Sequence, residues 1–159
     1  MGRLFSVGSA KKIKEKLYII IPRLKSIKSE KEYKAFHSEF CHWMMRNIKM
    51  APKQKRKHPS FGQSAKVLDI AMKVIVYYCG IGGEKVISFL NSAIDTLLLG
   101  YLKRRSKSLT FKKLTIIGDI DKKAYNELQW QVRREIEEEF EGTLLPVQYD
   151  DIIWRRLNR

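Results

Sequence analysis

Residues 61–101 read FGQSAKVLDIAMKVIVYYCGIGGEKVISFLNSAIDTLLLGY and form the most apolar part of the chain, with far more charged residues on either side. In the first half of this stretch, Lys66, Asp69 and Lys73 recur at spacings of three and four residues. On a helix, this spacing gathers them into one narrow polar stripe. The pattern predicts a mostly buried helix covered elsewhere by apolar residues, namely Val67, Leu68, Ile70, Ala71, Val74, Ile75 and Tyr78.

A glycine-rich turn follows this helix. Gly80, Gly82 and Gly83 supply the backbone freedom that a helix stop and a tight reversal require. Glu84 then lies in the first turn of a second helix, where a carboxylate suits the helix dipole. The second helix is expected to bury Val86, Leu90, Ile94, Leu97 and Leu98. We therefore predict a central apolar helical hairpin within a mainly α single domain, 1–159, built as a bundle of five or six helices.

Length and composition fit one ordinary domain. A chain of 159 residues with 44% hydrophobic residues can bury roughly two-thirds of its unfolded surface without a metal or a disulfide. Cys41 and Cys79 are too few for a disulfide framework and suit a reducing compartment. We see neither the roughly 18 to 20 uncharged residues of a spanning helix nor the features of a secretory signal. We expect a soluble cytoplasmic protein with no membrane span.

The net charge of +15 is unevenly distributed along the chain. Residues 1–60 hold 16 Lys and Arg against 4 acids, and residues 101–118 hold 6 against none. Residues 61–100 are balanced at 3 against 3, whereas residues 119–159 hold 7 against 10. A positive field of this size attracts polyanions, of which nucleic acid is the commonest and an anionic membrane surface the next. The charge also fits simple solubility or an acidic protein partner.

Helix signals recur before the hairpin. Ser9 is expected to cap a helix from about 10 to 21, in which apolar residues line one face and lysines the other. Ser29 followed by Glu32 is a capping-box pattern, and it predicts a helix over about 30–49.

Helix signals also recur after the hairpin. Residues 122–140 carry apolar residues at helical spacing, Gly142 stops this helix, and Pro146 opens a short final one. The acidic run near the end of the longer helix suits neither phosphate binding nor the helix dipole. We expect it to pair with cations elsewhere in the fold or in a second copy of the chain. This run comprises Glu135, Glu137, Glu138, Glu139 and Glu141.

Two basic segments lie outside the core elements, beyond a flexible lead-in at 1–8. Residues 50–60 hold five Lys, Arg and His side chains together with Pro52 and Pro59, which predicts an exposed extended loop. Residues 102–118 form a basic connector. If both segments face the same side, they make one phosphate-binding groove. The cations expected to contact phosphate are Lys53, Lys55, Arg56, Lys57, Lys103, Arg104, Arg105, Lys107, Lys112 and Lys113.

The weaker candidates for a catalytic role are Asp95, Asp119, Asp121 and His58. Asp95 lies in an apolar helix, where pairing with neighbouring polar groups competes with a role at a phosphate or metal site. Residues 114–121 read either as a strand whose two aspartates hold a divalent metal or as a loop in which one aspartate caps the next helix. We favour the cap, because no second strand-like run is present.

Several familiar catalytic motifs are missing. The chain contains no GxxxxGK[ST], GxGxxG, CxxC or GxSxG, which disfavours P-loop, Rossmann and zinc-ribbon proteins. His37 and Cys41 are one helical turn apart and supply only half of a metal site. Arg56 and His58 are closer together than the Arg and His of HEPN-type helical ribonucleases. We expect no cofactor, and a divalent metal only if the protein is a nuclease.

Three short segments carry a resemblance to a known family. FGQSAK at 61–66, AID at 93–95 and YDDIIW at 149–154 resemble the segments of a family of prokaryotic helical proteins with FGQAQK-like and PID-like sequences. The similarity covers roughly residues 59–154, and Ala93 replaces the proline of the family pattern. The resemblance implies a helical fold and brings no known activity with it.

These observations together favour binding over catalysis. We predict a nucleic-acid-binding protein that contacts DNA or RNA phosphates through its two basic segments, with little reading of the bases. The enzymatic alternative is a small helical nuclease that depends on a metal or a histidine. A third possibility is an interaction subunit, whose acidic helix or basic loops bury against another protein or a second copy of the chain.

Overall fold

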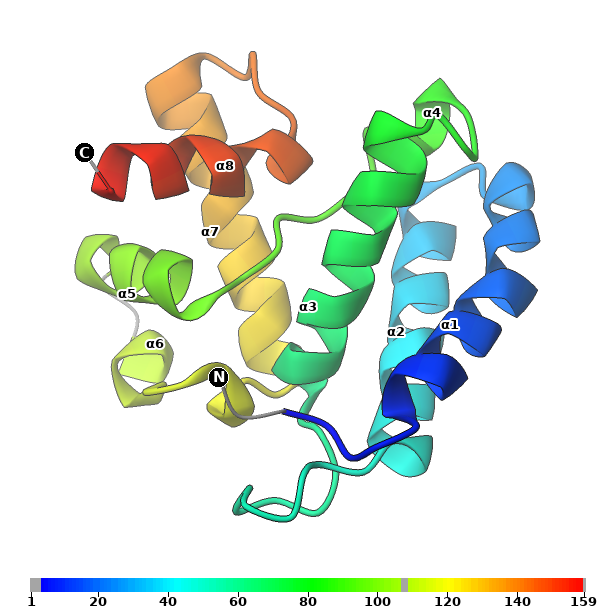
Figure 1. Cartoon of the computed structure of the whole chain (residues 1–159). Helices are drawn as coiled ribbons and strands as arrows, with labels where there is room; N and C mark the ends of the chain where they lie inside the picture. The colour runs from blue at the N-terminus through cyan, green and yellow to red at the C-terminus, as the bar shows by residue number, and fades with distance from the viewer. Residues whose placement is uncertain (1–3, 107–108, 159) are drawn as a thin grey trace.

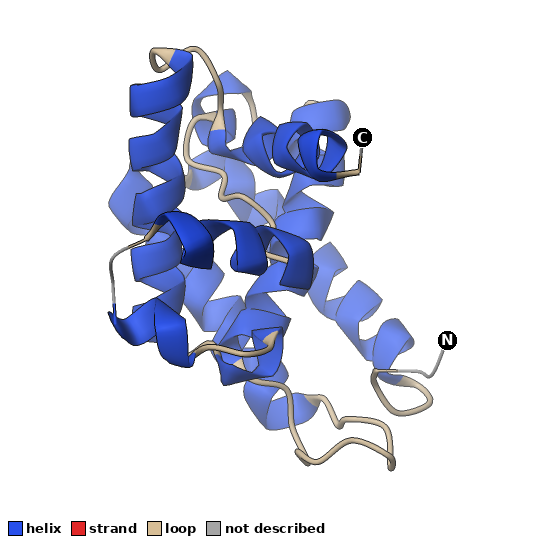
Figure 2. Ribbon diagram, turned by 90° about the vertical axis from the view of Figure 1, so that its left-hand side faces the viewer, coloured by secondary structure: helices blue, strands red, loops and turns tan. Residues whose placement is uncertain are grey.

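The computed structural model describes residues 4–106 and 109–158, and within them the chain is α-helical (Figures 1 and 2). Six helices have ten residues or more: α1 (Ser9–Ile20), α2 (Glu30–Asn47), α3 (Phe61–Met72), α5 (Thr96–Arg105), α7 (Lys122–Phe140) and α8 (Pro146–Leu157). Two are short: α4 (Glu84–Ile87) and α6 (Leu109–Lys113). Short 3-10 helices occupy Ile21–Ser26 and Ile117–Asp119, and a π-helix occupies Lys73–Tyr78. The predicted all-α class is confirmed, and the six longer helices fit the predicted bundle.

Two helices begin at the capping residues that the sequence predicts. The Ser29 side chain accepts a hydrogen bond from the Glu32 backbone N–H at the start of α2. Asp121 accepts one from the Ala124 backbone at the start of α7, so the cap reading of this aspartate is confirmed. The expected cap at Ser9 is wrong, because the N-cap of α1 is the preceding glycine in a left-handed conformation and Ser9 itself is buried in the first turn.

The first arm of the predicted hairpin is helical, but its buried face differs from the prediction. Asp69 and Lys73 are buried at 2% and 8% exposure. Ile70, Val74 and Tyr78 are instead 46%, 49% and 63% exposed. The expectation that these three apolar residues are buried is therefore wrong. The charged stripe can face inward because partners from distant segments satisfy both of its buried members, as described below.

The second arm of the predicted hairpin is not one helix. After the reversal at 80–83, α4 lasts only four residues, and the chain is then non-helical until α5 begins at Thr96. The Gln129 side chain accepts a hydrogen bond from the Ser92 backbone N–H and donates one to the Ser92 carbonyl. A side chain from α7 therefore replaces the backbone partners that a helix would have supplied here.

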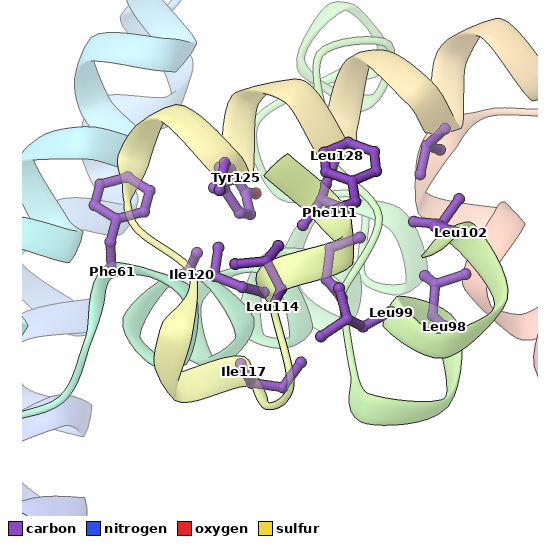
Figure 3. Close-up of a cluster of buried hydrophobic side chains, with 14 of the residues drawn as sticks. Phe61, Leu98, Leu99, Leu102, Phe111, Leu114, Ile117, Ile120, Tyr125 and Leu128 are labelled. Atoms are coloured by element: carbon purple, nitrogen blue, oxygen red, sulfur yellow. The ribbon is translucent and has the colours of Figure 1, made fainter. Parts of the chain in front are cut away.

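Two clusters of buried side chains make up the core, and α3 contributes to both. One cluster lies mainly among α1, α2, α3 and α4 and includes Val147 of α8, and the other lies mainly among α3, α5, α6, α7 and α8 and includes Cys41 of α2. Figure 3 shows that side chains of the second cluster come from different segments, among them Phe61 of α3, Leu99 of α5 and Leu128 of α7. Figure 1 shows α3 between α2 and α7, so the two clusters meet along this helix.

The first described residues are tied to the basic loop. Phe5 and Met50 form an isolated antiparallel bridge. The Ser6 backbone N–H donates to the Lys49 carbonyl at 2.9 Å, and the Ala51 N–H donates to the Leu4 carbonyl at 3.0 Å. These contacts hold residues 4–6 against the chain, so the expectation of a flexible lead-in does not apply to them. Within the described ranges, no residues form a strand.

Gly62, at the start of α3, packs closely against residues 117–120. Its N–H donates to the Ile120 carbonyl at 2.9 Å, and the Ser60 hydroxyl donates to the Ile117 carbonyl at 3.2 Å. A Cβ atom at Gly62 would lie 2.5 Å from Cβ of Ile120 and 2.8 Å from the Ile117 carbonyl oxygen. Only glycine allows the chain to approach this closely without a shift of the backbone.

We predict that Gly62→Ala lowers the free energy of unfolding by about 1–3 kcal/mol, because its Cβ overpacks against fixed atoms. Gly100→Ala is the matched control, since Gly100 also lies in a helix and its Cβ would meet only the Arg104 side-chain tip at 3.8 Å. Helix propensity should make the control neutral or more stable by up to about 1 kcal/mol. Urea unfolding followed by circular dichroism measures both. Equal stabilities for the two variants would contradict the close approach at Gly62.

Candidate functional site

The basic loop, residues 50–60, is held in a defined shape at the lower end of the molecule as drawn in Figure 1. The Met50 N–H donates to the Lys57 carbonyl at 3.0 Å, and Nδ1 of His58 lies 2.9 Å from the Ile48 carbonyl. His58 thus anchors the end of the loop to the end of α2. The side chains of Lys53, Lys55 and Lys57 are exposed, and the described residues provide no ion pair for any of them.

Arg56 links the loop to the connector. Its guanidinium lies 3.7 Å from Asp119, and the same carboxylate accepts hydrogen bonds from the Thr115 hydroxyl and from the backbone N–H groups of Thr115 and Ile116. These hydrogen bonds, followed by the charge of Arg56, hold the pKa of Asp119 below its ordinary value. Asp119 therefore organises the turn at 115–119 and helps to bring the two basic segments together.

The connector cations have different surroundings. Lys112 and Lys113 on α6 are exposed, and so is Arg104. Lys103 donates to the Leu114 carbonyl, so its ammonium is used within the fold. Arg105 forms ion pairs with Glu139 and with the buried Glu135, which leaves it unsuited to phosphate.

Lys107, also predicted to contact phosphate, lies outside the described residues. The expectation that the acidic run pairs with cations elsewhere in the fold is confirmed for two of its members. Glu135 and Glu139 both bind Arg105, and Glu139 also lies 3.7 Å from Arg156.

Sequence reasoning missed two further cations at the same end. Lys122 and Lys123 lie in the first turn of α7 and are exposed. That turn follows Ile120, which is hydrogen-bonded to Gly62 just after the basic loop. We call the loop 50–60, together with Lys122 and Lys123, the basic end; α6 lies at its side, also in the lower half of Figures 1 and 2.

The structure does not bring the four weaker catalytic candidates together. Asp95 caps α5 by accepting the Leu98 N–H at 2.7 Å, rather than pairing from within a helix as expected. Asp121 caps α7, Asp119 organises its turn and His58 anchors the loop. Among the described residues, no three His, Cys, Asp or Glu side chains are grouped as a metal site requires.

A buried polar network lies instead where α2, α3 and α7 meet. Nε2 of His37 lies 2.9 Å from Oδ1 of Asp69, and the Tyr125 hydroxyl donates to Oδ2 at 2.7 Å. The rings of His37 and Tyr125 stack with centroids 5.1 Å apart. Burial, and next the charge of Asp69, hold the pKa of Tyr125 well above its ordinary value, so its hydroxyl stays protonated and remains a donor.

Cys41 extends this network, with its sulfur 3.7 Å from Nδ1 of His37. A Cys–His–Asp series of this kind has the connectivity of a nucleophile activated through a base. Two facts oppose that role: Cys41 has 0% exposure, and burial raises the pKa of its thiol. A protonated sulfur without access to solvent cannot attack a substrate. We therefore assign a structural role to the network, in place of the metal site considered for His37 and Cys41.

A cleft of about 760 Å³ lies beside this network, between α2 and α7. Its aromatic lining comprises Phe61, Tyr125 and Trp130, and its polar lining includes Asn91, Lys122, Asn126 and Arg133. Nothing in the sequence alone marked this cleft, because its walls come from helices some 90 residues apart in the chain. Trp130 lies between two glutamines on α7, and its exposure becomes apparent only in the structure.

A separate, smaller hollow of about 280 Å³, here called the acidic hollow, lies between two of the segments that carry the family resemblance. Ala93 and Asp95 line it together with Asp150, Asp151 and Trp154. Lys73 neutralises part of this charge by pairing with Asp150 at 3.0 Å and with Asp151 at 2.7 Å. Burial raises the pKa of Asp150 to about 6, although Lys73 opposes this shift.

No family model, curated protein or solved structure matches this chain. The resemblance therefore rests on the three short segments alone, and the site has to be judged by its own geometry. None of the described helices is both long enough and apolar enough to cross a lipid bilayer.

The buried network predicts that removing the hydroxyl group affects the free energy of unfolding differently at two buried tyrosines. Tyr125→Phe should lower the free energy of unfolding by about 1–3 kcal/mol, because Oδ2 of Asp69 loses its donor inside the core. Tyr33→Phe is the control, since the Tyr33 hydroxyl is buried and has no hydrogen-bond partner in the described chain. This second variant should differ from wild type by less than about 0.5 kcal/mol or be more stable. Equal losses in urea unfolding would contradict the assignment.

Asp150 predicts a pH dependence. Its folded-state pKa of about 6 exceeds the unfolded value of about 3.9, so the folded state loses stability as pH rises from about 4 through 6. Asp150→Asn cannot ionise and escapes this loss. Its unfolding free energy relative to wild type should therefore rise, by up to about 3 kcal/mol, between about pH 4 and pH 7.5. Urea unfolding at several pH values measures the difference, and a flat difference would contradict the raised pKa.

Proposed function

We propose that the protein binds nucleic acid through phosphate contacts made by the basic end, with little reading of the bases. The observation that carries the proposal is the ordered basic loop, whose exposed lysines have no ion pair among the described residues. They are Lys53, Lys55 and Lys57. Cations presented in this way can neutralise phosphates and release the counterions condensed on them.

The placement of Lys122 and Lys123 supports the same reading. A helix N-terminus carries partial positive charge, so two lysines in the first turn of α7 do not stabilise the helix. The carboxylate of Asp121 precedes them at the N-cap, but it accepts the Ala124 N–H and forms no ion pair with either lysine among the described residues. Two unfavourable cations beside an already basic loop add to one positive field that is available to an external anion.

Several acidic side chains elsewhere are paired with internal cations. Glu39 forms a bidentate pair with Arg23, and Glu138 lies 3.5 Å from Arg134. At the basic end, the Arg56–Asp119 contact is the ion pair that the described residues show. The exposed lysines of the loop are therefore not neutralised by the described part of the fold, which leaves them available to a polyanion.

The two other functions considered have less support. A nuclease would need its catalytic groups close together, whereas Asp95, Asp119, Asp121 and His58 occupy separate structural positions. An interaction subunit would use the acidic helix or the basic loops, and Glu135 and Glu139 of that helix already bind Arg105. We therefore keep nucleic-acid binding as the proposal.

A salt titration tests the proposal. We predict that changing Lys53, Lys55 and Lys57 to Gln weakens binding to a DNA or RNA oligonucleotide and reduces the slope of log affinity against log salt by about 2 to 3. The control changes Lys25, Lys28 and Lys31 to Gln, which are equally exposed and lie near the opposite end of α2. The control should leave the slope almost unchanged.

A wild-type slope near zero would remove the proposal, and so would equal effects of the two triple variants. The same samples, incubated with Mg²⁺, also test for cutting. Cleavage that Asp119→Asn or His58→Ala abolishes, with the fold retained, would replace binding by the nuclease alternative.

A further inference from the structure

The cleft between α2 and α7 begins where the basic loop ends. Phe61, which directly follows the loop, lines the cleft, and so does Lys122 of the basic end. A strand whose phosphates follow the basic end therefore has the mouth of this cleft next to it. Its volume of about 760 Å³ lies within the usual range for sites that hold a small organic group.

Trp130 gives the cleft an exposed aromatic wall. Its side chain is 61% exposed, although it is the largest residue type and lies on a helix that buries its other aromatic residue of this region, Tyr125. A second hollow of about 470 Å³ adjoins Trp130, and Arg134 stacks on the indole at 5.1 Å. An indole ring bordering two hollows offers a flat surface on which a nucleobase can stack, and cations around it suit the flanking phosphates.

Polar groups that the fold leaves available surround this aromatic wall. Asn126 and Lys122 are exposed and have no hydrogen-bond or ion-pair partner in the described chain. Asn91 is 8% exposed and has one weak contact, at 3.4 Å, to Arg133. Nη1 of Arg133 is buried without a partner there. These donors and acceptors match the edge of a base, which is rich in both.

Carboxylates near the cleft do not oppose a nucleotide strongly. Glu30 lies 2.8 Å from Lys34, and Glu39 is held by Arg23. Glu127 has no such ion pair, but it lines the second hollow rather than the cleft. The described lining of the cleft therefore presents paired acids together with Lys122, which has no ion-pair partner there, and Arg133, which lies 4.0 Å from Glu30.

We propose that the cleft takes an unpaired base of single-stranded DNA or RNA, stacked on Trp130, while neighbouring phosphates lie along the basic end. This inference rests on the proposed function and names its substrate class. A base inside a duplex has both faces covered and cannot enter, so single strands should bind more tightly than duplexes. Because every base has a flat face, stacking agrees with little sequence reading.

Two tryptophans allow a matched test with a thymidylate oligonucleotide of about twelve residues. Trp130→Ala should weaken binding by about 5- to 100-fold, the cost of one lost stacking contact, and should leave the salt slope unchanged. Trp154→Ala, a similarly exposed tryptophan at 53%, lines the acidic hollow and should change affinity less than about twofold. Circular dichroism confirms that both variants remain folded.

An abasic oligonucleotide of equal charge separates this inference from the proposed function. Wild type should bind it as weakly as Trp130→Ala binds the thymidylate strand. If the two strands bind alike, or the two tryptophan variants behave alike, while the salt slope persists, the base site is wrong and phosphate binding stands. If neither strand shows salt-dependent binding, both proposals fail. Competition by free thymidine monophosphate equal to that of the polymer would instead assign the cleft to a free nucleotide and overturn the single-strand reading.

Discussion

The carboxylate of Asp69 lies fully inside the protein where α2, α3 and α7 meet, and the arrangement of these helices depends on how it is satisfied. Burying an unpaired carboxylate costs several kcal/mol, so His37 and Tyr125 must both reach it. One partner comes from α2 and the other from α7. The three-way contact therefore fixes the rotation of α3, turns its charged stripe inward and leaves Ile70 and Val74 in solvent.

Sequence reasoning succeeded where the deciding contacts are local. The helix over 122–140 could be predicted because its cap, its periodic face and its stop are all close in sequence, and the structure has the same bounds. The second arm of the hairpin could not be predicted, because the Gln129 side chain that holds Ser92 out of a helix comes from 37 residues away. The prediction of which face of α3 is buried was wrong for the same reason. Periodicity shows that the helix has a polar stripe, but it does not show which residues that stripe contacts.

For the candidate site too, the sequence predicts local properties but not contacts between distant segments. Loop 50–60 could be identified from its charge and prolines, because exposure of such a segment is a local property. The sequence could not show which cations remain without an ion pair in the fold. In the sequence, Arg105 is equivalent to its neighbour Arg104. In the fold, however, Arg105 pairs with the buried Glu135, which also accepts hydrogen bonds from Tyr149 and Gln131. Lys122 and Lys123 lie at the basic end because Ile120, which precedes them in the chain, is hydrogen-bonded to Gly62, a contact between distant parts of the chain.

Ion pairs within the fold neutralise part of the molecule's charge. Acidic residues of α7 and α8 bind Arg105, Arg156 and Lys73, so the positive and negative charges there cancel within the fold. Because those acids are already occupied, they cannot screen the lysines at the opposite end. A local cluster of exposed cations, such as the basic end, can orient an approaching polyanion. In the proposed binding mode, the strand meets the end at which the cleft opens, and a stacking contact there would add affinity that charge alone does not provide.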